Sequence, residues 1–304
     1  MKTRNFNLGS RDMTRAAATA LNADRAAGKI SYLTVAATLQ RFDKFKEFAK
    51  EAGAGRFEKI DRALVQQYAQ NLRESAYSAS YQQNLLSAVN SVMSRVSEHG
   101  GRNWETVSAR AEGLAQRSFI RTEQTASREQ SSAAIQNMTP RAAAVAELAR
   151  ELGLRSKEAS LLNNHNALRQ AETRGSVTIV DGTKGGRLRE IPITNQRQVD
   201  ALRNAATVQG SGRSIIPTGQ NWNQFRNGEL NDNRSSLQAQ GVRGYHELRS
   251  AYAADRYEQL TGHAAPVNGG QITDRDADRA AREQISAELG HGRIDVVSEY
   301  IGGR

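Results

Sequence analysis

The chain has 304 residues, of which 38% are hydrophobic and 24% are charged. This length and composition are typical of a soluble globular protein with two domains. The chain has no cysteine, which excludes disulfides, thiolate metal sites and a cysteine nucleophile, and fits a reducing cytosol. No stretch approaches the roughly 18 apolar residues of a membrane span, and the first residues lack the apolar run of a signal peptide.

The charge balance is the first indication of a partner. Lysine and arginine total 42 against 32 acidic residues, which gives a net charge of +10. Such a surplus favours a polyanionic partner, because each phosphate that the protein neutralises releases condensed counterions. Nucleic acid is the commonest such partner in the cytosol. Simple solubility and binding to acidic membranes are the alternatives at this point.

Three amphipathic helices are predicted in the first hundred residues. Their apolar residues recur every three or four positions: Leu39, Phe42, Phe45 and Ala49; Leu64, Val65, Tyr68 and Leu72; Leu85, Leu86, Val89, Val92, Met93 and Val96. Asp61 is the expected N-cap of the second helix, and Ser80 with Gln83 has the spacing of a capping box before the third. Stripes at this spacing indicate a helical core rather than a cofactor site.

A polar, aperiodic stretch at residues 121–132, RTEQTASREQSS, is the expected interdomain linker. The next predicted helix has Thr139 as its N-cap, Pro140 at its first position and Gly153 after its end. In the following region, GSVTIVDGTKGGRLREIPIT, apolar and polar residues alternate on both sides of a glycine-rich turn. This alternation predicts a β-hairpin.

The rest of the chain is expected to begin with a polar, loop-rich stretch from about 205 to 240. Helices are expected again around 244–260 and 274–290. No internal repeat is visible. The predicted layout is therefore a small helical domain, a linker, and a larger, mainly helical domain with one small antiparallel sheet.

Several residues of the second region could do chemistry on a phosphate. His246 and Arg249 are three positions apart and share a helix face, where they could hold and protonate a phosphate oxygen. Arg155 offers a planar fork of donors that matches phosphate, although a surface arginine paired with Glu158 is the plainer reading. Taken alone, each of these signals more often marks a solvated surface.

Three further residues stand at exposed turns or chain ends. Lys184 lies at the tip of the predicted hairpin, where it could reach a DNA minor groove or a leaving oxygen, and a solvated charge is the alternative. It does not belong to a nucleotide-binding P-loop, because that glycine-lysine pattern is absent. His291 follows a Leu-Gly step at a helix end, and Tyr300 stands nine positions later.

Taken in order, these residues resemble the catalytic set of the tyrosine recombinases, the phage-integrase family. GLRSKEASLL resembles the first arginine box of that family, with Arg155 at the arginine and Glu158 at its acidic companion. TKGGRLREIPI resembles the lysine box with Lys184, and HELRSAYAADRY resembles the His-x-x-Arg box. LGHGRIDVVSEY has the spacing from histidine to the nucleophilic tyrosine. The resemblance covers about residues 140–301, and the N-terminal region is similar, less specifically, to the core-binding domain of the family.

The resemblance implies a two-domain fold that is mainly α with a small antiparallel β-sheet. Residues 1–120 would form a helical, SAM-like core-DNA-binding domain, 121–132 a linker and 133–304 the catalytic domain. The two domains would close around duplex DNA as a C-shaped clamp. The implied partners are double-stranded DNA, three further copies in a homo-tetramer on paired recombination sites, and an accessory DNA-bending protein.

The implied activity is that of a site-specific recombinase or integrase of a mobile genetic element, which cuts and rejoins DNA through a 3′-phosphotyrosyl intermediate. Neither a metal nor ATP nor another cofactor is needed. The expected location is the cytoplasm, on the nucleoid, for a protein encoded by a bacterium or a phage. The alternatives with the same residues are a type IB topoisomerase, a resolvase or a catalytically inactive DNA-binding factor; a generic basic nucleic-acid-binding protein leaves the ordered set unexplained.

Each matched residue carries an expected role. Arg155 and Arg249 would bind the non-bridging phosphate oxygens, and His291 would add a third hydrogen bond. Tyr300 would attack phosphorus, His246 would accept its proton, and Lys184 would protonate the leaving 5′ oxygen. Two features depart from the family pattern. The gap between Arg249 and His291 is long, with TGHAAPVNGGQ as an expected loop, and few residues follow Tyr300, which leaves the usual C-terminal oligomer contact open.

Overall fold

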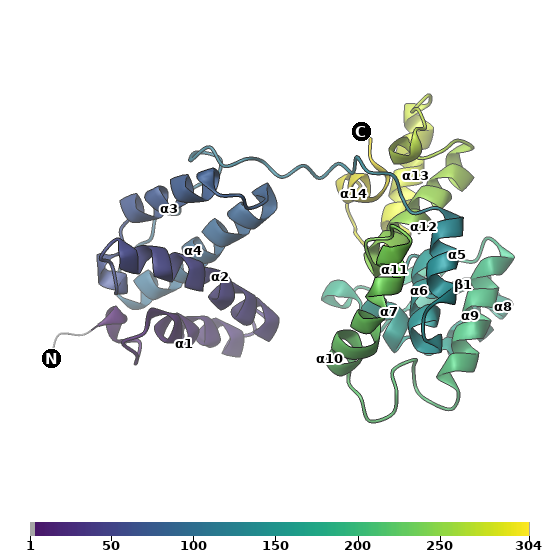
Figure 1. Ribbon diagram of the computed structural model, residues 1–304, viewed down its shortest axis with the longest axis horizontal. Coiled ribbons are helices and arrows are strands. Elements are labelled where there is room, and N and C mark those ends of the chain that lie inside the picture. The colour runs from purple at the N-terminus through teal and green to yellow at the C-terminus, as the bar shows by residue number, and fades with distance from the viewer. Residues whose placement is uncertain (1–3, 304) are drawn as a thin grey trace. The chain divides into compact units, whose positions relative to one another are not determined.

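The computed structural model describes residues 4–303, with the side chain of Lys184 excepted. The chain forms two compact units, Met1–Arg117 and Ser118–Arg304 (Figure 1). Both are mainly helical, and the second contains one two-stranded antiparallel sheet. The predicted fold class is therefore confirmed. Within the described residues, no helix has the length and apolarity that a membrane crossing requires.

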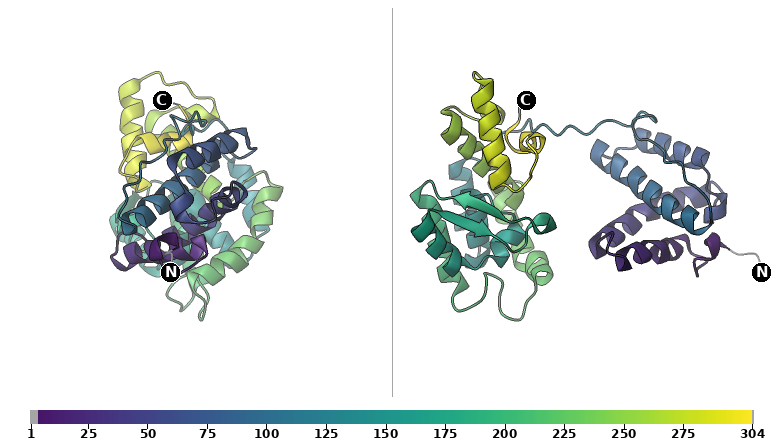
Figure 2. Two further views of the ribbon diagram at one scale, coloured as in Figure 1. Left: turned by 90° about the vertical axis from the view of Figure 1, so that its left-hand side faces the viewer. Right: turned by 180° about the vertical axis from the view of Figure 1, so that it is seen from behind.

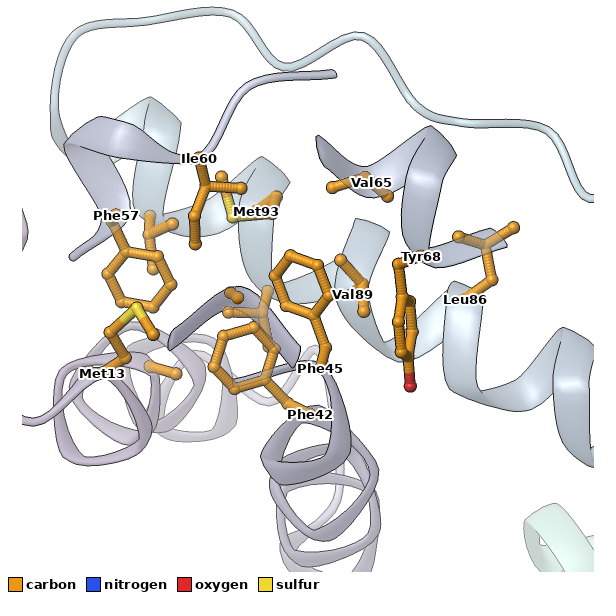
Figure 3. Close-up of a cluster of buried hydrophobic side chains, with 14 of the residues drawn as sticks. Met13, Phe42, Phe45, Phe57, Ile60, Val65, Tyr68, Leu86, Val89 and Met93 are labelled. Atoms are coloured by element: carbon orange, nitrogen blue, oxygen red, sulfur yellow. The ribbon is translucent and has the colours of Figure 1, made fainter. Parts of the chain in front are cut away.

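From residue 4 onward, the first unit contains four α-helices: α1 (Met13–Ala26), α2 (Tyr32–Glu51), α3 (Arg62–Glu74) and α4 (Ala79–His99). The predicted apolar stripes meet in one core, where the ring centroids of Phe45 and Tyr68 are 5.1 Å apart (Figure 3). Asp61 caps α3 as predicted, through its contact with the backbone N–H of Leu64. The predicted cap of α4 is wrong: the cap is Ser78, whose backbone is extended and whose hydroxyl accepts from the N–H of Tyr81, whereas Ser80 lies inside the helix.

The second unit is built around helix α6 (Pro140–Leu152), which packs against α5, α7, α9 and α12 (Figure 1). Its helices and strands, in chain order, are α5 (Arg128–Gln136), α6, α7 (Ser156–Leu161), α8 (Asn164–Arg174), β1 (Ser176–Ile179), β2 (Arg189–Pro192), α9 (Gln196–Gln209), α10 (Trp222–Phe225), α11 (Arg234–Ala239), α12 (Tyr245–Thr261), α13 (Arg275–Glu288) and α14 (Ser298–Ile301). As predicted, Pro140 opens α6, and Gly153 ends it with a φ of 63°.

The predicted hairpin is formed by β1 and β2, in which Val177 pairs with Ile191. Both side chains are fully buried. The turn between the strands contains a short 3-10 helix, η3 (Lys184–Gly186). Strand β1 lies along α8 and β2 lies against α13, and the right view of Figure 2 shows the strands as arrows below the yellow helix α13. The hairpin therefore connects α8 with α13, two helices that lie far apart in the sequence.

The stretch expected to be a linker, residues 121–132, differs in the structure. Its second half is the start of α5, where Ser127 and Gln130 form a capping box. Its first half is held to the second unit, because the backbone N–H of Arg121 donates to the carbonyl of Ser298 at 2.9 Å. The polar side chains that predicted a linker instead supply caps and ion pairs. The boundary between the units lies earlier, after Arg117.

The stretch from 205 to 240 is also more ordered than its polarity predicted. Helix α9 runs to Gln209, and α10 continues through a π-helical segment, η4 (Arg226–Leu230), to α11. The buried residues Phe225, Leu230 and Leu237 are five and seven positions apart. A π turn widens the spacing between residues on one face, so the apolar pattern does not show the period of an α-helix.

Candidate active site

Arg249 lies at the centre of the site and is completely buried. It projects from α12, and its guanidinium donates to the carbonyl oxygens of Gly153 and Leu289. Its Nε lies 3.4 Å from the hydroxyl of Tyr300, and its Nη2 lies 3.3 Å from Nε2 of His291. Burial lowers the pKa of Arg249 to about 10, so the group stays cationic at neutral pH. The site therefore has a fixed positive charge at its core.

Tyr300 is the second buried group, with 3% of its surface exposed. Its hydroxyl lies 3.0 Å from Nε2 of His291. Because a guanidinium can only donate, the contact with Arg249 identifies Nε2 of His291 as an acceptor. The tyrosine hydroxyl is then the donor to the same nitrogen. Tyr300 is thus positioned within its own chain, not at a fraying end.

The helix that carries Tyr300 is anchored on both sides. Val297 and Ile301 are fully buried in the core beside α12 and α13. Arg282 donates to the hydroxyl of Ser298 at 3.2 Å and to the carbonyl of Gly302 at 3.0 Å. Gly302 has a φ of 67°, and a Cβ atom there would lie 2.7 Å from the carbonyl oxygen of Arg121. Only glycine fits this close approach, which fixes the end of α14.

His246 lies one helical turn before Arg249, on the exposed side of the site. The centroid of its ring is 5.4 Å from that of Tyr300. Desolvation of the ring and the charges of Arg249 and Arg155 lower the pKa of His246 to about 4. The ring keeps its access to solvent, and the neighbouring positive charges disfavour a further proton on it. His246 is therefore neutral at physiological pH.

His291 follows the end of α13, where its backbone N–H donates to the carbonyl of Ser286 at 2.9 Å. Burial, followed by the charges of Arg249, Arg155 and Arg189, lowers the pKa of His291 to about 3. Like His246, it is neutral at physiological pH and can accept a proton. The long segment before it is a loop as expected, because α12 ends at Thr261 and α13 begins only at Arg275.

Glu158 organises the arginines of the site. Its carboxylate is fully buried and accepts from the backbone N–H and the Nη1 of Arg155, both at 2.7 Å. Arg189 binds the same carboxylate with two nitrogens, at 2.7 and 2.6 Å. Burial opposes ionisation, but the hydrogen bonds and charges of Arg189 and Arg155 hold the pKa of Glu158 below its ordinary value. Arg155 thus keeps its pairing with Glu158 and still exposes 22% of its side chain.

Arg189 is a residue of the site that motif reasoning missed. It lies two positions before Ile191 on strand β2 and therefore points to the same, buried face. Besides Glu158, it donates to the carbonyl of Glu288 at 2.8 Å, at the end of α13. A cation at an inward position of a predicted strand is the signal that could have identified it, because a buried charge needs a partner.

Lys184 opens the 3-10 helix at the hairpin turn, and its side chain lies outside the described part of the structure. The turn itself is located by its neighbours. A Cβ atom at Gly182 would lie 3.0 Å from the carbonyl oxygen of Lys157, and Nη1 of Arg187 lies 3.5 Å from the carbonyl oxygen of His291. The turn therefore lies between the start of α7 and His291.

The structure thus brings five of the six predicted residues together: Arg155, His246, Arg249, His291 and Tyr300. Two arginines, two neutral histidines and a tyrosine hydroxyl form a site suited to bind an anion and to transfer a proton. In residues 4–303, no group of three or more His, Asp or Glu side chains is placed to hold a metal ion.

Solved structures with the same fold are DNA recombinases. A post-cleavage complex of the XerH site-specific recombinase with palindromic difH substrate has a TM-score of 0.64 at 14% identity, covering 96% of this chain and 82% of that one. A lambda integrase dimer on a COC′ core site has a TM-score of 0.64 at 14% identity, covering 94% and 76%. The Tn1549 transposon integrase with transposon right end DNA has a TM-score of 0.62 at 10% identity, covering 99% and 95%. At these identities the likeness shows the fold.

Sequence comparison finds a similarity to one family over part of the chain. No curated protein matches the chain. The sequence model of the integrase family matches residues 113–255. The match contains Arg155, Lys184, His246 and Arg249 and ends before His291 and Tyr300, which the fold brings to the same site. Residues 113–255, most of which lie in the second unit, are therefore similar to the integrase family, and the fold brings the later residues His291 and Tyr300 to the same site.

Proposed function

We propose that the chain is a site-specific DNA recombinase or integrase that breaks and rejoins DNA strands through a 3′-phosphotyrosyl intermediate. The observation that carries this proposal is the position of the Tyr300 hydroxyl, 3.0 Å from Nε2 of His291 and 3.4 Å from Nε of Arg249. A tyrosine held between a neutral histidine and a buried arginine lies beside the groups that cleavage of a phosphodiester requires. The family match over the same unit supports it.

Binding of the scissile phosphate is the role of the two arginines and His291. The guanidinium of Arg155 is the partly exposed one, and its pairing with Glu158 fixes its direction. Arg249 is rigidly held by two backbone carbonyls. Negative charge builds on the non-bridging oxygens in the transition state, so preorganised cations lower the barrier. His291 adds a hydrogen bond to the same oxygens once its ring proton has moved from Nδ1 to Nε2, because Nε2 is an acceptor in the free site.

Proton transfer is the role of His246 and Lys184. A phosphate held by Arg249 and His291 would take the place of the hydrogen bond between His291 and Tyr300. His246, whose ring faces Tyr300 and whose pKa is about 4, is then the neutral base that accepts the phenolic proton. Lys184, on the hairpin turn between α7 and His291, donates a proton to the 5′ oxygen as its bond to phosphorus breaks.

The reaction balances without an external energy source. A bond forms between the Tyr300 oxygen and phosphorus, and the bond from phosphorus to the 5′ oxygen breaks. The phosphotyrosyl ester conserves the energy of the phosphodiester. The 5′ hydroxyl of another strand can therefore reverse the step on a new partner. Neither a metal nor ATP takes part in the proposed steps.

Double-stranded DNA is the proposed partner, and four copies on paired sites are the proposed assembly. The net charge of +10 supports a DNA partner. Among chains of the same fold, XerH is bound to its difH substrate, and lambda integrase forms a tetramer on a Holliday junction. The helical first unit is the proposed core-DNA-binding domain.

Covalent trapping on a plasmid library tests the proposal. The protein is incubated with nicked fragments of the library plasmids and then denatured. The DNA that remains attached to the protein is sequenced. We expect an adduct with a shared sequence for the wild type and none for Tyr300→Phe, which keeps the ring and DNA binding. Tyr252→Phe is the matched control, because the Tyr252 hydroxyl is engaged by Glu288 at 2.8 Å and should not matter for the adduct.

Two results would contradict the proposal. An adduct that persists in Tyr300→Phe would place the nucleophile elsewhere. Adducts spread over unrelated sequences, together with relaxation of supercoiled plasmid, would favour a type IB topoisomerase with the same chemistry.

A further inference from the structure

The loop between α12 and α13, residues 262–274, has no part in the site described above. It accounts for the long gap between Arg249 and His291 in the sequence. The loop contains a short 3-10 helix, η5 (Pro266–Asn268), which lies against α14, the helix that carries Tyr300. We call the three residues of η5 the brace.

The loop is folded tightly, so the brace has a fixed position. The backbone N–H groups of Asn268 and Gly270 donate to the carbonyl of Ala265, at 2.8 and 3.2 Å. A Cβ atom at Gly270 would collide with the carbonyl oxygen of Ala264, so this closure requires glycine. Val267 is 7% exposed and packs in the apolar core that α14 shares with α12 and α13.

The side chain of Asn268 binds one residue of the segment that enters the second unit. Its Oδ1 accepts from the backbone N–H of Thr125 at 3.0 Å, and its Nδ2 lies 3.0 Å from the threonine hydroxyl. The two residues are 143 positions apart in the sequence. Within residues 4–303, all hydrogen bonds of this amide go to Thr125. Asn268 therefore fixes the entering segment at Thr125.

The other end of the entering segment is bound to α14. The backbone N–H of Arg121 donates to the carbonyl of Ser298 at 2.9 Å, and Figure 1 shows the chain reaching the second unit beside α14. The guanidinium of Arg121 folds back onto the carbonyls of Glu123 and Gln124, at 2.6 and 2.9 Å. These bonds make residues 121–125 one compact turn. A displacement at Thr125 is therefore transmitted to α14.

The brace also bears directly on the chain that follows α14. A Cβ atom at Gly302 would lie 3.1 Å from the Cβ of Val267, and one at Gly303 would lie 2.8 Å from the ring of Pro266. The chain thus crosses η5 at a distance that leaves no room for side chains at these two positions. Both ends of α14 are therefore held by the loop, one through the entering segment and one by contact.

Such support matters because α14 cannot hold Tyr300 by itself. A helix of four residues has little stability of its own. In the proposed reaction, the phosphate displaces the hydrogen bond between His291 and Tyr300. The direction of the phenol then depends on the contacts behind α14, and a displacement of about 1 Å can slow a reaction strongly.

From these contacts we infer that Asn268 is a positioning residue for Tyr300, and that the loop 262–274 keeps α14 in place while the phosphate is bound. The inference rests on the proposed function, because it takes Tyr300 as the nucleophile. Asn268 takes no part in the chemical steps and acts through Thr125 and Arg121. The loop that lengthens the gap between the motif residues thereby supports the reaction.

Hydrogen exchange of the full chain without DNA tests the support independently of cleavage. We expect Asn268→Ala to speed exchange by about tenfold at residues 121–125 and 298–303, because the segment loses its hydrogen bonds to the loop. Exchange in α6 and in the first unit should not change. Asn268→Asp keeps an acceptor for the N–H and the hydroxyl of Thr125, so its exchange should match that of the wild type.

Single-turnover adduct formation tests the consequence for the reaction. Asn268→Ala should lower the rate constant by about tenfold at unchanged affinity for duplex DNA, and Asn268→Asp should restore the rate. Asn137→Ala is the matched control. It removes an exposed amide that donates to the carbonyl of Ala133 at 2.8 Å, and it should change neither the exchange of α14 nor the rate.

Three results would overturn the inference. These are unchanged exchange of α14 in Asn268→Ala, faster exchange with an unchanged rate constant, and a loss of DNA affinity that accounts for the lower rate. A wild type that forms no adduct would instead contradict the proposed function. Exchange alone would then decide whether the loop holds α14.

Discussion

At the scale of single residues, the site depends on charges that are buried and paired. Arg189 is the clearest case, because 3% of its side chain is exposed and it binds the fully buried Glu158 with two nitrogens. Removing one partner of such a pair leaves an uncompensated charge. Arg189 thus holds Glu158, which in turn directs Arg155.

We predict that Arg189→Met destabilises the second unit by about 3–5 kcal/mol, measured by urea unfolding of the full chain. Glu158→Gln combined with Arg189→Met removes both charges and should cost less than the sum of the two single variants. Strictly additive costs would show that the two side chains do not stabilise each other.

Acid should destabilise the protein through His291. Its pKa in the folded chain is about 3, whereas an unfolded histidine titrates near 6.5. The unfolded state therefore binds the proton first, and stability is lost as the pH falls from about 6.5 toward 3. We expect wild-type unfolding free energy to fall by up to ~1.4 kcal/mol per pH unit more steeply than that of His291→Asn between pH 6 and 4.5. Parallel pH profiles for the two proteins would contradict the lowered pKa.

The sequence motifs predicted most residues of the candidate site but not Arg189, which supports them. Arg155, His246, Arg249, His291 and Tyr300 stand in recognisable local motifs. Arg189 stands in the same hairpin box as Lys184, but its role depends on a partner 31 positions away. Such a pairing is created by the packing of β2 against α13, which brings Arg189 to Glu158 of α7, and leaves only a weak trace in the sequence, a cation at an inward strand position.

At the scale of elements, the short helix α14 must be held so that Tyr300 meets Arg249. The bend after it depends on Gly302, whose Cβ position would lie 2.7 Å from the carbonyl oxygen of Arg121. We predict that Gly302→Ala displaces α14 and lowers adduct formation by about tenfold or more, as misplacement of a reacting group does, while DNA binding is kept.

Gly262→Ala provides the matched control for this prediction. Gly262 also has a positive φ, of 78°, but no atom lies within 4 Å of its Cβ position. It therefore shares the backbone strain without the collision. Equal losses of adduct in the two variants would attribute the effect to strain alone and not to the position of α14.

The elements that sequence reasoning misjudged share a physical cause. Residues 222–239 lack a clear helical period, because the π segment shifts the buried face between Phe225 and Leu230. Residues 121–132 are polar because they cap α5 and form ion pairs, such as that of Arg121 with Glu247. Polarity by itself does not distinguish a solvated linker from a segment held by hydrogen bonds.

At the scale of the whole molecule, the chain consists of two units joined by an exposed connection. Leu114 is buried in the core of the first unit, and residues 115–120 are all exposed. Exposed connections are the usual sites of nicking. We predict that limited trypsin digestion cuts first after Arg117 and releases two stable fragments. A first cut after Arg121 or Arg128 would show that the segment before α5 is not held as the hydrogen bonds indicate.

The central claim, that Tyr300 forms a covalent bond to DNA, is tested most directly by mapping the attachment site. The trapped adduct is trimmed with nuclease, digested with trypsin and examined by mass spectrometry. Because Arg293 precedes it, Tyr300 lies in the peptide of residues 294–304. The proposed chemistry predicts a nucleotide joined through its 3′ phosphate to Tyr300 in that peptide. A nucleotide on a peptide that contains Tyr252 or Tyr257 instead would contradict the assignment of the nucleophile.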